Sequence, residues 1–504
     1  MRRATAHPAT TVILAALFAC AVTPALAQGP RPTSSLALTA QQLARPAALP
    51  SWMRQAGDSP MAASSDTLRC PDCNPPKRFW AAAGELMLVQ LIPHFYNADV
   101  RDAVWAQVSA QSVKNNLTYA WQWDDNQFVN NQFSHPYHGS LYFNSARTNG
   151  YNFWESFAWP FVGSAMWEIA GEAWAPAPND FLNTSFGGVV LGETLFRLSS
   201  LALDNTATGS ERTFREIGGF LLDPLRGFNR LIRGETHGVS ANPPDWRPSS
   251  IFGVLDVGYR RTANQFSFDS VKTGIDQWDL GFKLAYGDAV TDLRGKPFSY
   301  FGVAAEVAGP PPDSARRLNR LSARGSLAAW PLGSSGRHQF ALMMEYDYFN
   351  NPAIEYGGQS VLAGVVSTFG EKGKNFWAQT SVLFDGVVIG ATKSDYYTTL
   401  EGRDYDYGPG LGASLSGTLF YKHHLQANLS YLGIWIHTID GSQSAHYQDA
   451  LSFEARYWMN RRLGLGASIT RYSRTSDYTG QPDVSQDAGF LRAFVSTAIP
   501  GIPE

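Results

Sequence analysis

The sequence predicts an α+β protein in which an N-terminal helical domain precedes an antiparallel β-barrel of about twelve strands, one for each alternating segment after Ile251. Two further observations support this fold. The chain begins with a secretion signal, and its helical stretches are interrupted by carboxylates. A secreted chain with strands that alternate between apolar and polar residues is typical of a barrel in a bacterial outer membrane.

The alternation is clearest from Trp278 to Gly287. The even-numbered positions of this segment are Trp, Leu, Phe, Leu and Tyr, and the odd-numbered positions are Asp, Gly, Lys, Ala and Gly. Successive side chains of a strand point to opposite faces, so this segment has one apolar face and one small or charged face. In a membrane barrel, the apolar face meets hydrocarbon and the other face lines a wet lumen.

The N-terminus has the organisation of a secretory signal, which we place at residues 1–27. Two arginines precede an apolar run from Val12 to Val22, and Ala25-Leu26-Ala27 forms a small-x-small cleavage site. The apolar run is too short to span a membrane. Cleavage before Cys20, with acylation of that cysteine, is an alternative that a bulky preceding residue makes less favourable.

Composition narrows the range of partners. The formal net charge is −3 and the chain has no basic tract, so nucleic acid is not an expected partner. Aromatic residues make up 13% of the chain and charged residues 16%, proportions that suit a membrane interface. The expected partners are outer-membrane lipid and the barrel-assembly machinery, and no cofactor is expected.

Residues 28–77 are rich in Pro, Ala and Ser and predict a disordered periplasmic leader. The leader contains Cys70-Pro-Asp-Cys73. In an oxidising compartment, a local disulfide between these cysteines is expected. A thioredoxin-like redox motif would need a strand before it and a helix after it. A metal site would need two more ligands nearby, and none is evident in the sequence.

A helical domain is predicted over residues 78–240. Its apolar stretches run from Phe79 to Phe95, from Phe153 to Trp174 and from Phe186 to Leu203, and a last helix is expected from about Arg215 to Ile232. None of these stretches reaches about twenty uninterrupted apolar residues, the length of a membrane-spanning helix.

The barrel is predicted over residues 250–500. An even number of strands suits closure, and closure leaves no exposed sheet edge. Residues 422–424 and 460–462 predict tight periplasmic turns that alternate with longer outer loops. Only the segment 375–392 has no consistently apolar face. The predicted strands are Ile251–Ala263, Gly274–Asp288, Phe298–Gly309, Leu318–Leu332, His338–Asn350, Tyr356–Gly370, Asn375–Thr392, Tyr405–Tyr421, Lys422–Thr438, His446–Asn460, Arg462–Tyr478 and Ser485–Ile499.

A soluble β-sandwich is the alternative to a membrane barrel, because it would bury the apolar faces against each other. Regular hairpin spacing, glycines on the polar face and the secretion signal favour the barrel. The chain departs from many outer-membrane barrels in one respect: no aromatic residue ends the last strand, and Phe490 and Phe494 lie deeper in it.

The lumen is expected to hold charges of both signs in similar number. A selective pore would more often show one dominant sign along its constriction. We therefore expect these residues to pair with one another across the lumen. They are Asp256, Arg260, Asp279, Lys283, Arg324, Glu345, Asp347, Glu454, Arg456 and Arg492.

Glu168 and Glu172 are the most informative pair of charges in the helical domain. Residues four apart share a helix face, where two carboxylates repel each other. A bound cation, a shared proton, or a partner such as His135, His138 or Arg147 would each explain the pair. Neither the histidines nor the glutamates fall in a known ligand motif, so no metal site is predicted.

Two interpretations of this cluster remain open. The polar residues form a buried network that holds apolar helices in register, or they support metal-assisted or general acid–base hydrolysis. Glu193 and Arg197 also have the spacing of a helix ion pair. The candidate catalytic residues are His135, His138, Glu155, Glu168 and Glu172, and the polar network is completed by Asn144, Arg147, Asp180, Asn183, Glu193, Arg197, Arg226 and Asn229.

The segment from His135 to Arg197, with Asp223-Pro224-x-Arg226-Gly227-x-Asn229-Arg230-x-x-x-Gly234 after it, resembles the domain of unknown function 3943 over roughly residues 130–235. That family occurs in Gram-negative bacteria as secreted helical segments usually followed by a β-rich region. The resemblance implies an envelope protein and supplies no catalytic residue. The matching positions are His135, His138, Gly139, Asn144, Arg147, Glu155, Glu168, Glu172, Asp180, Gly192, Glu193, Arg226 and Asn229.

Two functions are compatible with these features. The first is a non-enzymatic outer-membrane barrel in transport, lipid handling or envelope organisation, with its helices at the periplasmic mouth or plugging it. The second is a membrane-associated hydrolase or lipid-modifying enzyme that uses the His/Glu cluster; no G-x-S-x-G elbow supports acyl transfer. A redox role for Cys70 and Cys73 is a third, weaker possibility.

Overall fold

The computed structural model describes residues 69–309, 318–351, 354–372 and 374–499. They divide into two compact units. Unit 1 contains residues 69–75 and 195–247, and unit 2 contains residues 76–194 and 248–499. The expected signal peptide and most of the expected leader lie outside the described residues.

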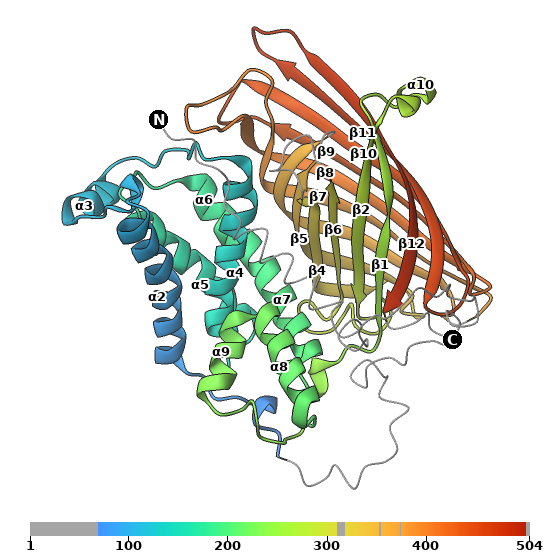
Figure 1. Cartoon of the computed structure of the whole chain (residues 1–504), viewed down its shortest axis with the longest axis horizontal. Coiled ribbons are helices and arrows are strands. Elements are labelled where there is room, and N and C mark those ends of the chain that lie inside the picture. Colours follow the sequence, from blue (N-terminus) through green and yellow to red (C-terminus); the bar gives the residue numbers. More distant parts are fainter. Residues whose placement is uncertain (1–68, 310–317, 352–353, 373, 500–504) are drawn as a thin grey trace, which may run out of the picture. The chain divides into compact units, whose positions relative to one another are not determined.

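In unit 2, twelve strands of the described chain form a closed antiparallel barrel, in which each strand pairs with its neighbours in sequence and β1 pairs with β12 (Figure 1). The predicted fold class is therefore confirmed. The strands are β1 (Ile251–Ala263), β2 (Ile275–Tyr286), β3 (Phe301–Gly309), β4 (Leu318–Pro331), β5 (His338–Asn350), β6 (Glu355–Gly370), β7 (Phe376–Lys393), β8 (Tyr405–Tyr421), β9 (Leu425–His437), β10 (Ser444–Trp458), β11 (Leu463–Tyr478) and β12 (Val484–Ile499).

The two ends of the barrel differ in their connections. Four joins at one end are short, at residues 332–337, 371–375, 422–424 and 459–462, and we call this the short-turn end. The join 422–424 reverses the chain through positive φ angles of 49° at Lys422 and 58° at His423. The opposite end, the long-loop end, carries the joins 264–274, with α10 (Phe268–Lys272), and 394–404.

The strand register places the charges that the sequence assigned to the lumen on the inner face, where they pair across the barrel. Arg456 donates to Asp256 at 2.9 Å and lies 3.1 Å from Glu454. Lys283 also reaches Glu454, at 2.6 Å. The other pairs are Arg492 with Asp279, Arg324 with Glu345 at 2.8 Å, and Arg260 with Glu306 at 2.6 Å.

A β-bulge explains why the segment 375–392 shows no consistent apolar face. The register between β7 and β8 shifts between Val387 and Gly390. Before the bulge, the inner-face residues are Asp385 and Val387. After the bulge, the inner-face residues are Gly390 and Thr392. A bulge adds one residue, so the alternation changes phase within a single strand.

The helices of unit 2 include several π-helical turns. A helix that contains a π turn admits one extra residue, and such turns are frequent at functional sites. None of the helices in the described residues combines the length and hydropathy needed to cross a bilayer. The elements are α2 (Phe79–Phe95), η5 (Tyr96–Val100), η6 (Val104–Ala106), α3 (Ala110–Thr118), η7 (Asn130–Ser134), α4 (His135–Arg147), α5 (Phe153–Met166), η8 (Trp167–Gly171), α6 (Pro178–Leu182), η9 (Asn183–Gly187) and the start of α7 (Gly188–Ala202).

Segment 126–133 and Asn179 contact the outer wall of the barrel through four tyrosines, which we call the tyrosine seam: Tyr346, Tyr348, Tyr405 and Tyr407. The hydroxyl of Tyr346 donates to the carbonyl of Gln132 at 2.7 Å, and that of Tyr405 donates to the carbonyl of Asn126 at 2.7 Å. The amides of Asn131, Gln132 and Asn179 donate to tyrosine hydroxyls in return.

The tyrosine seam lies outside the barrel and not in the lumen. In β5, Glu345 and Asp347 are on the inner face, so Tyr346 and Tyr348 between them are on the outer face. At the same wall, η9 contacts β5 and β6. The hypothesis that the helices plug the barrel is therefore wrong for segment 126–133, because a plug would contact the inner face.

Unit 1 contains the end of α7, α8 (Gly209–Leu222), α9 (Pro224–Ile232) and the turns η4 (Pro71–Cys73) and η10 (Pro244–Trp246). The single helix predicted from Arg215 to Ile232 is in fact two. Pro224 cannot continue a helix, and the Asp223 side chain instead accepts from the N–H of Arg226 to begin α9.

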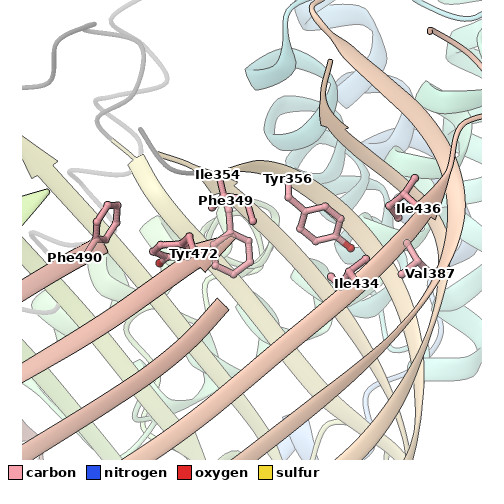
Figure 2. Close-up of a cluster of buried hydrophobic side chains, with 8 residues drawn as sticks. All are labelled: Phe349, Ile354, Tyr356, Val387, Ile434, Ile436, Tyr472 and Phe490. Atoms are coloured by element: carbon pink, nitrogen blue, oxygen red, sulfur yellow. The ribbon is translucent and has the colours of Figure 1, made fainter. Parts of the chain in front are cut away.

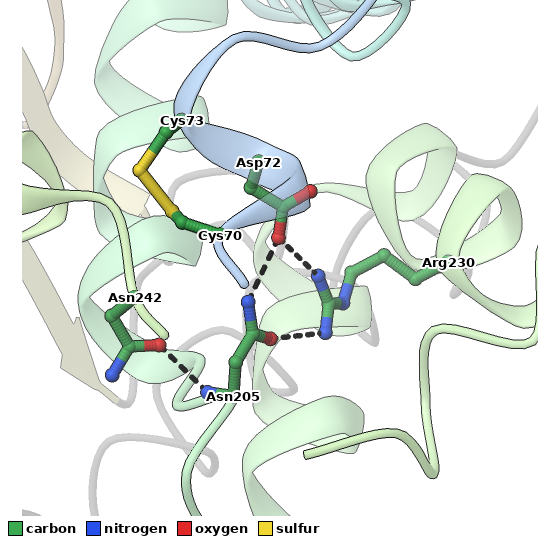
Figure 3. Close-up of a disulfide and its surroundings, with 6 residues drawn as sticks. All are labelled: Cys70, Asp72, Cys73, Asn205, Arg230 and Asn242. Atoms are coloured by element: carbon green, nitrogen blue, oxygen red, sulfur yellow. Dashed lines mark hydrogen bonds and ion pairs between the residues drawn. A yellow bond between two sulfur atoms is a disulfide. The ribbon is translucent and has the colours of Figure 1, made fainter. Parts of the chain in front are cut away.

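A disulfide joins Cys70 to Cys73 across η4 (Figure 3). The loop it closes presents Asp72 to two partners. Asp72 accepts from the Asn205 amide at 2.8 Å and from Arg230 at 3.4 Å. Arg230 also donates to the side-chain oxygen of Asn205 at 2.7 Å. The last part of the expected disordered leader is thus ordered, because residues 70–73 are bonded to the helices of unit 1.

Breaking a buried lumen pair should destabilise the barrel. We expect Asp256→Asn to lower the free energy of unfolding by about 3–5 kcal/mol, because Arg456 loses a charged partner away from water. The temperature at which the folded band on an unheated detergent gel converts to the unfolded band measures this. Asp276→Asn is the control, because its Arg261 pair on neighbouring strands is solvent-exposed. Equal shifts for both variants would contradict the prediction.

Candidate functional site

The lumen contains a cavity of about 510 Å³. Its lining includes Lys372, Lys374 and His423, which belong to short joins, so the cavity reaches the short-turn end. Its wall carries the paired charges, among them Glu454 and Arg456. Because these charges already pair with one another, the wall offers hydrogen-bonding groups of both signs and no strong net field.

Toward the long-loop end, buried apolar side chains of the inner face form a cluster (Figure 2). We call this group the apolar cluster. It comes from the inner faces of β5, β6, β7, β9, β11 and β12 and from the join after β5, and its members are Phe349, Ile354, Tyr356, Val387, Ile434, Ile436, Tyr472 and Phe490. Phe349, Tyr472 and Phe490 also line the cavity and form its floor.

One feature of the sequence could have predicted the apolar cluster. In β9, the inward positions Leu432, Ile434 and Ile436 are apolar, and Trp435 between them is apolar as well. A strand with both faces apolar is unusual in a wet-lumen barrel, where the inner face is ordinarily polar. Such a strand marks the depth at which apolar side chains gather in the lumen.

A second candidate site is the polar interior of the helices in unit 2. Glu168 lies in η8, is 2% exposed, and accepts from the N–H of Ala177 through Oε2 at 2.8 Å. Its Oε1 is buried without a hydrogen-bond partner. Burial and the nearby Glu172 raise the pKa of the Glu168 carboxyl well above its usual range. Both effects favour the protonated form of this carboxyl.

Glu168 and Glu172 do not share a helix face, contrary to the prediction. The helix ends with η8 at Gly171, and Glu172 has an extended backbone with φ −127°. The Asn116 amide donates to the carbonyls of Glu168 and Glu172, at 3.3 and 3.1 Å. Glu172 accepts from the indole N–H of Trp167, and burial raises its pKa to about 7. Protonation and these hydrogen bonds offset the repulsion.

The histidines lie among the same helices without joining the two glutamates. His135 lies 3.6 Å from Asp180 and 3.3 Å from the Thr184 hydroxyl. A ring nitrogen of His138 lies 3.2 Å from the carbonyl oxygen of Val89. Burial lowers the pKa of His138 to about 4, so the ring is neutral and donates to this carbonyl. The His138 ring stacks on Tyr142, its neighbour one turn along α4.

Glu155 is separate from the other catalytic candidates. It closes a capping box with Asn152 at the start of α5 and pairs with Lys77 at 2.5 Å. Both carboxylate interactions are at the surface, where they favour the charged form and lower the pKa of Glu155. The structure therefore does not gather the five candidate residues around one reacting atom.

The remaining network residues are buried in both units. Arg147 donates to Glu193 at 2.8 Å, which gives Glu193 a partner on another helix. Asn183 donates to the carbonyl of Asn131 at 3.0 Å, and Asn144 is also buried. In unit 1, Arg197 is buried, Arg226 lies over the Phe196 and Trp246 rings, and Asn229 accepts from Arg233.

Among the described residues, no three His, Cys, Asp or Glu side chains are grouped so that they could hold a metal ion. Glycines let the helices approach closely: a Cβ on Gly139 of α4 would lie 1.8 Å from the carbonyl oxygen of Thr184 in η9. A Cβ on Gly163 of α5 would lie 2.6 Å from the Tyr142 ring. Both positions need glycine.

Comparison with known protein families finds a match to part of the chain. Residues 120–225 match the model of the domain of unknown function DUF3943. The resemblance predicted from the sequence is thus confirmed for this segment. The DUF3943 segment holds the π turns η7, η8 and η9 and the polar interior described above. Among curated proteins, no match to the chain was found.

Solved structures with some similarity to the chain are outer-membrane barrels. The NanC porin is 10% identical over 48% of this chain and 98% of its own, with a TM-score of 0.27. The anion-selective porin from Comamonas acidovorans is 10% identical over 49% and 98%, with a TM-score of 0.22. An outer membrane channel from Pseudomonas putida F1 is 10% identical over 51% and 100%, with a TM-score of 0.24. Similarity this low assigns no function.

The helix crossing at Gly139 gives a test of the packing in the DUF3943 segment. We expect Gly139→Ala to lower the free energy of unfolding by at least about 1–3 kcal/mol, because its methyl group would force α4 away from η9. Gly84→Ala in α2 is the matched control, since nothing lies within 4 Å of its Cβ, and it should be neutral or slightly stabilising. Urea midpoints followed by tryptophan fluorescence measure both. Equal urea midpoints for the two variants would contradict the close packing of α4 against η9.

Glu172 should make the stability of this segment depend on pH. Its pKa is raised in the folded protein, so its protonated form stabilises the fold below about pH 4.5, and this contribution is lost as the pH rises through about 7. Glu172→Gln should reduce that decline in urea midpoints measured between pH 4.5 and 8. Glu155→Gln is the control, because its pKa is lowered and its own contribution is lost at acid pH instead. A wild-type midpoint that does not fall over this range would contradict the prediction.

Proposed function

We propose that this protein is a non-enzymatic outer-membrane barrel that is closed to ion flow and holds a solute in a chamber open at the short-turn end. The observation that carries the proposal is the apolar cluster, because its buried side chains come from the inner faces of six strands and meet in the lumen. Transport through the barrel would then require the cluster to move.

The outer surface of the barrel supports the membrane location. Outward positions of β8 to β12 carry exposed apolar residues, including Leu411, Leu429, Phe453, Leu465 and Val495. Exposed aromatic side chains gather near both ends of the strands, with Phe340, Phe369, Phe376, Tyr421 and Tyr457 toward the short-turn end and Tyr259, Trp278, Trp435 and Tyr447 toward the other. Such an apolar band between aromatic girdles is typical of a transmembrane barrel.

The chamber supports binding of a solute that has both polar and apolar parts. Its floor is the apolar cluster, and its wall offers guanidinium, ammonium and carboxylate groups. Cavities of several hundred Å³ with apolar surface and a few convergent polar groups are the usual form of a small-molecule site. The paired charges hold the wall in place, so the chamber is preformed.

A non-enzymatic role is supported by the placement of the candidate catalytic residues. Glu155 is at the surface, His138 is held by a backbone carbonyl, and the Glu172 carboxyl is held by an indole N–H. Each therefore has a structural partner. A hydrolase would need them within hydrogen-bond reach of one substrate atom.

Conductance across a planar lipid bilayer tests the proposal. We expect the wild-type protein to insert without a steady ion current, because apolar side chains exclude water from the lumen. Phe349→Ala combined with Tyr472→Ala should produce discrete current steps. Phe453→Ala combined with Leu451→Ala, on the outer face of β10, is the control and should not conduct. A steady current through the wild-type protein, or a silent cluster variant, would contradict the closed lumen.

A further inference from the structure

Helix α2 has an apolar exposed face and a partly polar buried face. Trp80, Leu88, Ile92 and Phe95 are exposed, at 84%, 46%, 67% and 55%, and they recur at helical spacing along one side. The opposite side buries Glu85 and Gln90 at 4% and 6%. Glu85 accepts from the Asn149 amide, and Gln90 accepts from the Tyr142 hydroxyl.

Helix α5 shows the same inversion. Trp154 and Val162 are exposed at 57% and 53%, and Met166 is exposed as well. Ser156 and Ser164 are buried on its other side. In a water-soluble helix, the polar stripe faces solvent and the apolar stripe faces the core. The reverse arrangement in two neighbouring helices therefore suits an apolar environment around them.

The inverted helices belong to the same compact unit as the barrel, and α5 contacts it at its start. The Phe153 ring lies 5.7 Å from that of Phe298, which covers Gly325 midway along β4. The tyrosine seam continues the contact toward the long-loop end. The start of α5 and segment 126–133 thus lie beside the strands and not beyond the barrel ends, at a depth where the free wall is apolar.

The way the helices meet each other also fits an apolar surrounding. The crossing of α4 with η9 and α7 is made by Gly139 and Gly188, where a Cβ on either residue would collide with the backbone of the other. Close crossings at small residues and side-chain hydrogen bonds between helices are the means by which helices associate in lipid, where the hydrophobic effect cannot drive them together.

We infer that the exposed faces of α2 and α5 contact the acyl chains of membrane lipid, so that the helical part of unit 2 forms a lipid-facing buttress on one side of the barrel. This inference rests on the proposed membrane location of the barrel. For the helical part of unit 2, this lipid-facing position replaces the periplasmic position expected from the sequence. The polar network, including Glu85 and Glu168, then lies between lipid-facing helices, where hydrogen bonds to buried polar groups hold the helices together.

Spin labels on the full mature protein in phospholipid vesicles test this inference. Single cysteines replace Leu88 or Ile92 on α2, Phe384 on the outer face of β7, Lys272 in α10 and Ala82 on the buried side of α2. The disulfide between Cys70 and Cys73 leaves the introduced thiol as the labelled one. Collisions with oxygen report lipid, and collisions with a water-soluble nickel chelate report solvent.

We expect labels at Leu88 and Ile92 to match Phe384, with high oxygen and low nickel accessibility. Lys272 should show the reverse and Ala82 should be shielded from both reagents. Nickel accessibility at Leu88 and Ile92 equal to that at Lys272 would overturn the inference while leaving the barrel in the membrane. Shielding of these positions from both reagents would also overturn it, because a protein partner or second copy would then cover α2. A water-exposed Phe384 would instead overturn the membrane location itself.

Discussion

The rest of the structure depends on the hydrogen bonds between β1 and β12, which close the sheet on itself. A sheet without free edges satisfies its backbone N–H and carbonyl groups internally, and only then can its outer face be apolar without exposing polar backbone. Closure also creates an inner face that is separated from the outside by a wall one strand thick. Every later feature of the barrel follows from the difference between these two faces.

On the inner face, closure brings together charges that are far apart in sequence. Arg456 meets Asp256 because β10 and β1 are nearly opposite ends of the barrel sequence and close neighbours in the ring. The lumen would be open if this face were polar throughout. Instead, the apolar cluster gathers buried apolar side chains on this face toward the long-loop end, next to the cavity.

The outer face of the barrel wall meets two different environments. Most of it presents exposed apolar residues, whereas the tyrosine seam presents hydroxyl groups to the backbone carbonyls of residues 126 and 132. Tyrosine suits this position because its ring packs against neighbouring apolar groups while its hydroxyl satisfies a buried polar partner. Gly357 of β6 leaves room for Gln132 at the same place, since a Cβ there would collide with that side chain. The helical part is therefore built onto the wall by specific contacts.

The sequence by itself determined the strands, their number and their two faces, because a strand has a period of two residues and each face of a barrel has a different solvent. Its few errors have local causes: Pro224 divides one predicted helix, Gly171 ends another before Glu172, and a bulge changes the phase of β7. The sequence also singled out Glu168, Glu172 and the histidines as neighbours along the helices. Only the tertiary structure decided that Tyr346 and Tyr405 face a helical segment and not lipid, that Phe349 and Tyr472 meet inside the lumen, and that Glu155 lies apart from the other acids. These outcomes depend on which strands and helices become neighbours in space, and residues that are a hundred or more positions apart carry no periodic signal of one another.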